Sequence, residues 1–115
     1  MTKPYYYLID HMHQTYPVSM EQWARSNLDE NWTRVGHTIF NQEDIVVSTV
    51  FLGLDHRFLG EGDPILFETM IFGGSLDQWQ DRYTSWTDAK LGHNAAVTMV
   101  AKLLEEARNG KTEVT

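Results

Sequence analysis

The sequence predicts an α+β protein, with an antiparallel β-sheet of about four to five strands, a short N-terminal helix and a long C-terminal helix packed on one face of the sheet. Between residues 33 and 83, short runs of branched and aromatic residues alternate with turn-like segments. After residue 85 a single long segment has helical periodicity. The chain of 115 residues contains no repeat or linker, so we expect a single domain over residues 1–115.

The N-terminal part predicts a strand followed by a short helix. YYYLI (residues 5–9) is rich in aromatic and branched residues, as strands are. Its three adjacent tyrosines cannot all be buried on one face, so at least one ring should meet a helix, a partner or solvent. Ser19 is placed to cap a helix, Gln22 completes a capping box, and we expect the helix to run to about Leu28.

The middle of the chain predicts the body of the sheet. A strand is expected over residues 33–40, and residues 44–54 form the longest candidate. Both faces of that longest strand are largely apolar, so we expect it to be central and covered on both sides. A further strand over residues 64–72 would place Glu68 and Thr69 on opposite faces, and residues 80–83 are a candidate edge strand.

The last helix has the clearest signals. Ser85 is a typical N-cap, with Asp88 three residues on, and Asn109-Gly110 is a typical C-terminal stop after Arg108. The positions at helical spacing on its inward stripe are 86, 89, 93, 96, 97, 100, 103, 104 and 107. One of these positions is His93, so we expect its imidazole to face the sheet.

Composition excludes several classes of function. The chain has no cysteine, which removes disulfides and thiolate chemistry and fits a reducing cytosol. Its formal net charge of −7, with no cluster of basic residues, disfavours general nucleic-acid binding, although the charge also simply favours solubility. No apolar run is long enough to cross a bilayer, so we expect no membrane association.

His93 and Glu68 are the first candidate pair. A neutral imidazole beside a carboxylate is typical of a general base oriented by an acid. The same pair is also typical of a structural hydrogen bond between buried polar groups, or of a binding site. The sequence leaves these alternatives open.

A second candidate is Asp55-His56-Arg57, where a strand opens into the loop over residues 55–63. Arg57 could clamp an anion, or the triplet could be the solvated rim of a hairpin. We predict a ligand pocket where this loop meets the start of the last helix, whose N-terminus favours anions. The predicted ligand-binding residues are Asp55, His56, Arg57, Glu68, Arg82, Trp86 and His93.

Metal and cofactor signals are weak. Asp10, His11 and His13 have the spacing of partial metal sites but lack further placed ligands, so we expect no metal. The glycines of the 55–63 loop do not form a phosphate-binding motif, and no nucleophile elbow occurs. We therefore expect no cofactor and no catalytic residue.

Three segments carry a resemblance to a known group. VSTVFLGLDHRF (47–58), PILFETMIFGG (64–74) and RYTSWTDAKLGH (82–93) resemble a group of small proteins encoded by bacteriophages and prophages. The resemblance covers about half of the chain. It implies a viral or prophage origin and a place in the host cytoplasm, and it implies no chemistry.

Taken together, these features predict a binding protein rather than an enzyme. The leading hypothesis is a phage accessory protein that forms a homo-oligomer, with a dimer expected. It would bind either a small anionic ligand, such as a nucleotide-derived one, or a host protein. The phage resemblance adds counter-defence as a possible role. Two alternatives stay open: a small hydrolase using Asp55, His56, Glu68 and His93, with or without a metal, and a module that only binds proteins.

Overall fold

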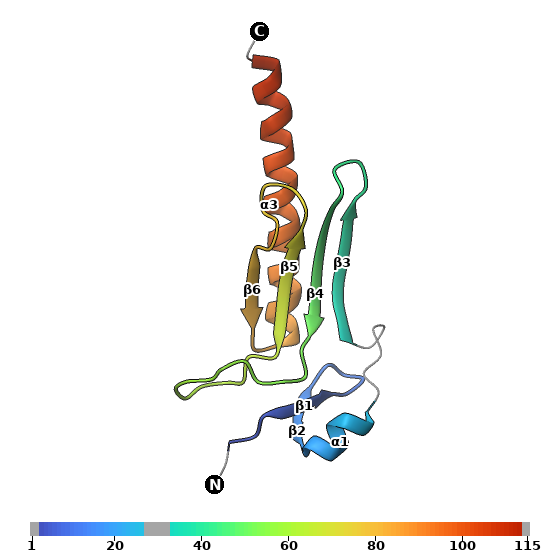
Figure 1. Cartoon of the computed structure of the whole chain (residues 1–115), viewed down its shortest axis with the longest axis vertical. Coiled ribbons are helices and arrows are strands. Elements are labelled where there is room, and N and C mark those ends of the chain that lie inside the picture. Colours follow the sequence, from blue (N-terminus) through green and yellow to red (C-terminus); the bar gives the residue numbers. More distant parts are fainter. Residues whose placement is uncertain (1–2, 27–32, 114–115) are drawn as a thin grey trace.

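A four-stranded antiparallel sheet and one long helix form the body of the protein (Figure 1). The computed structural model describes residues 3–26 and 33–113, with side chains to residue 110. The strands of the main sheet are β3 (Arg34–Phe40), β4 (Ile45–Phe51), β5 (Phe67–Phe72) and β6 (Gln80–Tyr83). The helix α3 (Trp86–Glu113) covers one face of this sheet, so the predicted α+β class is confirmed.

The order of the main sheet follows the chain, β3-β4-β5-β6, with every neighbouring pair antiparallel. Its register places Thr49 opposite Thr69, with Val47 opposite Ile71 on one side of that pair and Phe51 opposite Phe67 on the other. The candidate edge strand over residues 80–83 is confirmed as β6. The strand expected over 64–72 begins later, at Phe67. Ile65 instead bonds to Asp55 and His56 at the base of the 55–63 loop, and the Leu66 amide donates to the Tyr83 carbonyl.

The N-terminal part forms a separate hairpin, which sequence analysis missed in part. Strand β1 (Tyr6–Ile9) pairs with β2 (Thr15–Val18), a strand that was not predicted. The reversal between them is held by the Asp10 carboxylate, which accepts hydrogen bonds from the backbone amides of Met12 (2.8 Å) and Gln14 (3.0 Å). Such a side-chain turn gives little hydrophobic signal, which explains why β2 was not recognised.

The hairpin joins the end of the main sheet rather than extending it sideways. The Tyr7 amide donates to the Gly53 carbonyl and the Asp55 amide donates to the Tyr5 carbonyl, both at 2.9 Å. Tyr7 is buried in the core, Tyr6 contacts Trp23 of the first helix, and Tyr5 is exposed. The three tyrosines therefore divide between the core, a helix and solvent, as their adjacency requires.

The first helix, α1 (Met20–Arg25), begins as predicted and ends earlier than predicted. The Ser19 hydroxyl accepts from the Gln22 amide (3.1 Å), and the Gln22 side chain accepts from the Ser19 amide (2.9 Å), which is the predicted capping box. Ser26 closes the helix through a bond to the Trp23 carbonyl. Leu28, the expected end, lies outside the described residues.

The central strand β4 is covered on one face only, which corrects the expectation of cover on both sides. The side chains at positions 45, 47, 49 and 51 are buried beneath α3, whereas those at 46, 48 and 50 are only half-buried. Among residues 3–26 and 33–113, one helix packs on the main sheet, and it occupies one face. None of the helices or strands in these ranges covers the opposite face of β4 and β5, which is called the open face.

Helix α3 begins as predicted and extends further than predicted. The Ser85 hydroxyl accepts from the Asp88 amide at 3.1 Å, which confirms the N-cap. The expected stop at Asn109-Gly110 is wrong, because the helix continues to Glu113. A glycine within a helix costs only about 1 kcal/mol relative to alanine, so it does not force an end. Of the helices in the described ranges, none combines the length and apolar content that spanning a membrane requires.

Two apolar clusters form the core, separated by a polar layer. Near the hairpin lie Tyr7, Ile9, Val35, Phe51, Leu66, Phe67 and Ala89. Toward the C-terminal half of α3 lie Ile45, Val47, Ile71, Ala96 and Val100. The sheet register places Thr49 and Thr69 between these clusters, and His93 occupies the same level on α3 between Ala89 and Ala96.

A pair of neighbouring substitutions tests the one-sided cover. We expect Ile71→Ala to lower the free energy of unfolding by about 2–5 kcal/mol, because Ile71 is fully buried under α3. Phe72→Ala, on the open face, should cost less than about 1 kcal/mol. Urea denaturation of both variants measures the difference. Equal losses would mean that both faces are covered.

Candidate functional site

The residues predicted to bind a ligand do not converge on one site. His93 lies in the polar layer of the core, and Asp55 is buried at the base of the loop that also carries His56 and Arg57. Glu68 and Arg82 lie together on the main sheet, and Trp86 lies at the start of α3.

His93 is held between two strands by hydrogen bonds to both ring nitrogens. Nδ1 lies 2.7 Å from the Thr49 hydroxyl, and Nε2 lies 3.0 Å from the Thr38 hydroxyl. Thr49 is also 2.5 Å from the Thr69 hydroxyl, which accepts from the Tyr83 hydroxyl at 3.1 Å. The polar layer is therefore a continuous chain of these five residues, from Thr38 to Tyr83.

One direction of donation satisfies every bond in this chain. Tyr83 donates to Thr69, Thr69 to Thr49, and Thr49 to Nδ1 of His93, whose Nε2–H then donates to Thr38. This order requires a neutral imidazole. Burial, with smaller contributions from Lys90 and His37, lowers the pKa of His93 below its usual value and favours the same neutral form.

Two glycines make room for this layer. A Cβ on Gly36 would lie 2.7 Å from Cδ2 of His93, so only glycine lets the imidazole rest on β3. A Cβ on Gly92 would lie 2.2 Å from the Tyr83 ring. Both close approaches fix the position of α3 on the sheet. His93 has no free nitrogen and is 6% exposed, so it is a structural side chain rather than an accessible base.

The predicted contact between Glu68 and His93 is wrong. Strand alternation puts Glu68 on the open face, whereas its neighbour Thr69 faces α3 and His93. Glu68 instead forms a cross-strand ion pair with Arg82 on β6, at 2.9 Å. The sheet itself separates the two predicted partners, so the hydrolase that would combine them is contradicted by this geometry.

Asp55 connects the base of the 55–63 loop to Lys3 in the N-terminal segment. One carboxylate oxygen accepts from the amides of Arg57 (2.8 Å) and Ile65 (3.0 Å), and the other lies 3.2 Å from the Lys3 ammonium. Burial alone would raise the pKa of Asp55, but these amides and the Lys3 charge outweigh it and hold the pKa below its usual value. The carboxylate also raises the pKa of Tyr7, after the larger effect of burial. Asp55 thus stabilises the loop.

His56 and Arg57 are also engaged within the loop. Nδ1 of His56 bonds to the Leu54 carbonyl (2.8 Å), and Nε of Arg57 donates to the Asp63 carbonyl (2.8 Å). Phe58 and Leu59 at the tip are instead 70% and 88% exposed. Internal hydrogen bonds therefore hold the loop, and its tip is apolar and exposed. The Arg57 side chain bonds within the loop, so this hydrogen bond competes with binding of an anion.

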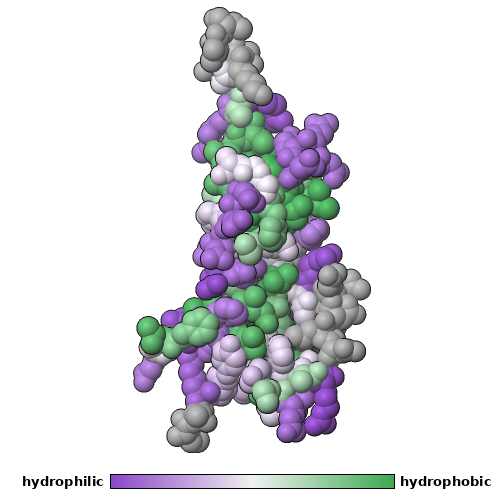
Figure 2. All heavy atoms as spheres, viewed as in Figure 1, coloured by the Kyte–Doolittle hydropathy of each residue, from purple (hydrophilic) through white to green (hydrophobic). Residues whose placement is uncertain are grey.

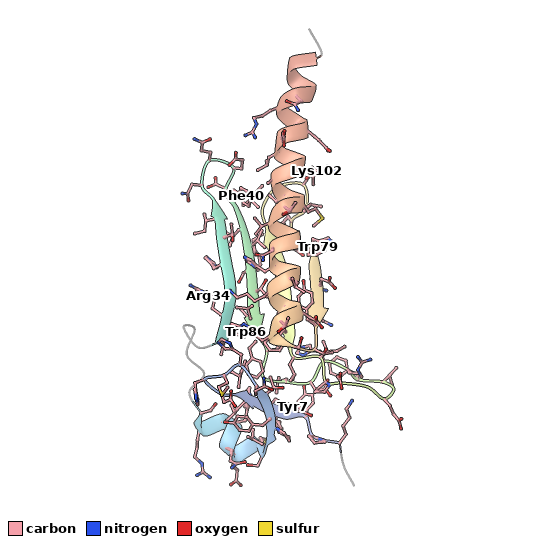
Figure 3. The ribbon with its side chains drawn as sticks, turned by 180° about the vertical axis from the view of Figure 1, so that it is seen from behind. Tyr7, Arg34, Phe40, Trp79, Trp86 and Lys102 are labelled. Atoms are coloured by element: carbon pink, nitrogen blue, oxygen red, sulfur yellow. The ribbon has the colours of Figure 1, made fainter. Side chains whose placement is uncertain are left out.

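Trp86 lies at the base of α3, next to the β1–β2 hairpin (Figure 3). The His13 ring stacks on it, with centroids 3.6 Å apart and planes 2° from parallel. A polar recess of about 270 Å³ opens here between residues 12–15 and 84–87. Neither Arg57 nor Arg82 lines this recess, so it is not the predicted pocket with two arginines.

The weak metal signal finds no support among the described residues, where no three histidine or acidic side chains gather as a metal would need. The Asp10 carboxylate accepts hydrogen bonds from the backbone amides of Gln14 and Met12, and these bonds lower its pKa. His13 is stacked on Trp86. The spacing of residues 10–13 therefore reflects a hairpin turn.

Sequence reasoning missed most of the polar layer. It identified His93 but not its partners, which are Thr38, Thr49, Thr69 and Tyr83. A signal was present, because Thr49 and Thr69 occupy inward positions in strands that are otherwise apolar on that side. Polar residues at buried positions need partners, and an inward histidine is such a partner.

Comparison with known proteins adds no assignment. No protein-family model matches the chain, and neither a curated protein nor a solved structure is detectably similar to it.

The polar layer predicts a pH dependence of stability. The folded pKa of His93 is below its unfolded value, so the unfolded chain takes up a proton first as the pH falls below about 6.5. The free energy of unfolding should therefore fall, by at most about 1.4 kcal/mol per pH unit for this one group. Asp55, whose pKa is also lowered, should add to the loss only below about pH 4.

Denaturant unfolding at a series of pH values measures this dependence, with His93→Gln as the comparison. The variant lacks the titrating imidazole, so its stability should fall less between pH 6.5 and pH 5 than that of the wild type. Parallel curves for the two proteins over this interval would show that His93 does not titrate differently in the folded and unfolded states.

Proposed function

We propose that this protein is a non-catalytic binding module that self-associates and recognises a partner protein through the open face of its main sheet. The observation that carries the proposal is the composition of that face. Antiparallel sheets with one free face usually present polar residues there, but several side chains on this face are apolar, and one complete row at the end of the strands is apolar. A contiguous apolar surface of this kind marks an interaction site.

The register of the sheet defines the apolar row. Ile39 lies opposite Val46, which lies opposite Phe72, so three adjacent strands contribute one side chain each. Ile39 is 53% exposed and Phe72 46% exposed. Met70 and Val50 continue the apolar surface toward the other end of the strands. We call these five residues the open-face patch.

Polar residues lie within and beside the patch. Ser48 lies between Val46 and Val50 on β4, opposite His37 and Met70, and the Glu68–Arg82 ion pair lies at the far end. Figure 2 looks onto this side of the molecule and shows hydrophobic atoms interspersed with polar ones. Protein interfaces commonly combine apolar and polar side chains.

The dimensions of the sheet set how much further surface a protein partner must contact. Four strands spaced about 4.8 Å apart, up to seven residues long, make a face of roughly 400 Å². A stable interface takes about 800 Å² from each side, so the partner must also contact neighbouring elements. The exposed Phe58 and Leu59 at the tip of the 55–63 loop, which projects from the molecule in Figure 2, are such an element.

The resemblance to phage proteins suggests where the partner comes from. A phage accessory protein acts in its host, so we propose a bacterial protein as the partner, with a component of host defence as one class. The homo-oligomer belongs to the same proposal. A small anionic ligand is the less supported version, because the predicted arginines engage the Asp63 carbonyl and the Glu68 carboxylate.

Affinity capture from bacterial lysate tests the proposal. We expect the wild-type protein to retain one bacterial protein in stoichiometric amount, and the double variant Ile39→Ser, Phe72→Ser to lose it by at least tenfold, because two apolar contacts are removed. Both positions are half-exposed, so the fold should survive, which circular dichroism verifies.

The matched control is Leu91→Ser, which removes an equally apolar side chain that is 64% exposed on α3. It should capture the partner as the wild type does. Loss of capture by the control but not by the double variant would contradict the proposal. Isothermal titration with nucleotides tests the alternative that the protein binds a small anionic ligand. If the double variant still binds a nucleotide, the binding site for that ligand lies outside the open face.

A further inference from the structure

We infer that two copies of this chain pair through the part of α3 that extends beyond the sheet, each copy covering an apolar groove of the other. The inference rests on the self-association included in the proposed function. It assigns that self-association to a surface separate from the open-face patch.

Helix α3 is much longer than the sheet that it covers. Its 28 residues span about 42 Å at 1.5 Å per residue, whereas the seven residues of β3 or β4 span about 24 Å. Figure 3 shows Lys102 close to the level of Phe40, the last residue of β3. The helix after Lys102, here called the overhang, therefore has no strand beneath it (Figure 1).

The apolar stripe of α3 continues onto the overhang. Ala89, His93, Ala96 and Val100 recur at intervals of three and four residues, and all are buried against the sheet. The next positions in the same series are 103 and 107, occupied by an exposed leucine and an exposed alanine. The apolar stripe therefore continues for about two turns past Val100, where Leu104 still packs against the core but Leu103 and Ala107 are exposed.

An apolar groove lies where the overhang leaves the sheet. It has a volume of about 120 Å³, and Ile45, Ile71, Leu76, Val100 and Leu103 are among the residues that line it. This volume approaches that of a cavity known to hold benzene, so it would accept an apolar side chain.

Two glycines form one side of this groove. Gly73 and Gly74 both have positive φ, +92° and +71°. A Cβ on Gly73 would lie 2.2 Å from the Asp44 carbonyl oxygen. Glycine therefore lets this wall pack directly on the start of β4.

The chain as a whole exposes enough surface for pairing with a second copy. The accessible surface is 7934 Å², whereas a compact monomer of 13.3 kDa exposes about 6,450 Å². The radius of gyration is 17.2 Å, against about 13 Å for a compact chain of this length. The excess of roughly 1,500 Å² is more than the 800 Å² or so that each partner of a standard dimer buries.

The overhang is also self-complementary. Its groove and its exposed Leu103 lie side by side, so a two-fold axis can place each leucine at the groove of the other copy. The charged residues from 102 to 108 are Lys102, Glu105, Glu106 and Arg108, whose charges cancel although the chain as a whole carries −7. Antiparallel pairing of two overhangs therefore meets no net repulsion and places Lys102 near the acidic pair of the partner.

Sedimentation equilibrium of the full chain tests this inference. We expect a wild-type dimer of twice 13.3 kDa and at least a tenfold higher dissociation constant for Leu103→Glu, which puts a carboxylate into the apolar contact. The control is Leu91→Glu, the same substitution at a more exposed leucine of the same helix, which should remain a dimer. Circular dichroism establishes that both variants fold.

The outcomes separate this inference from the proposed function. A monomeric wild type that still captures its bacterial partner would overturn the pairing and leave the proposed function standing. A dimer that Leu103→Glu and Leu91→Glu weaken equally, or not at all, would also overturn it. If only the double variant Ile39→Ser, Phe72→Ser dissociates the dimer, the second copy occupies the sheet face, and both assignments fail.

A second readout uses the absence of cysteine from the chain. Ala107→Cys, on the paired side of the overhang, should be joined to its copy by a short bis-maleimide. Ala95→Cys, an exposed position on the part of α3 that overlies the sheet, should not be joined. Equal joining of the two variants would contradict the pairing.

Discussion

The position of α3 on the sheet depends on the polar layer around His93. Apolar contacts alone do not fix how far a helix slides along a sheet, because they are not directional. The imidazole makes hydrogen bonds to Thr38 and Thr49 at the same time, and each of these bonds is lost if the helix moves by one residue. A buried polar group without a partner costs about 1–3 kcal/mol, so alternative registers are disfavoured.

This constraint determines which surfaces remain for function. The groups that suggested chemistry in the sequence are used to hold the fold together: His93 positions the helix, Asp55 the loop, and Arg82 pairs with Glu68. Three of the surfaces that remain are apolar, namely the open-face patch, the tip of the 55–63 loop and the overhang. These surfaces support the proposed binding role, because exposed apolar patches are typical of sites that contact other proteins.

Helices and strands with strong periodicity could be predicted from the sequence, whereas contacts between residues far apart in the chain could not. The α3 stripe, both serine caps and the four main-sheet strands follow from local patterns. Which residues contact Glu68 and His93 depends on which face of β5 packs against α3. The alternation of side chains along a strand defines two faces but does not say which of them the helix covers. The Asp10 turn and the continuation of α3 through Gly110 were missed because each rests on a few weak local preferences.

The one-sided cover of the sheet and the length of α3 have a common physical consequence. A sheet of this size needs a second layer to bury each of its faces, and the part of the chain that the structure describes provides a layer for one face. The same helix carries apolar residues past the end of the strands, where the sheet cannot bury them. Apolar side chains that are retained at such positions lower the free energy only when another molecule covers them. Because the two surfaces lie in different places, one can be occupied by a second copy while the other stays open to a partner.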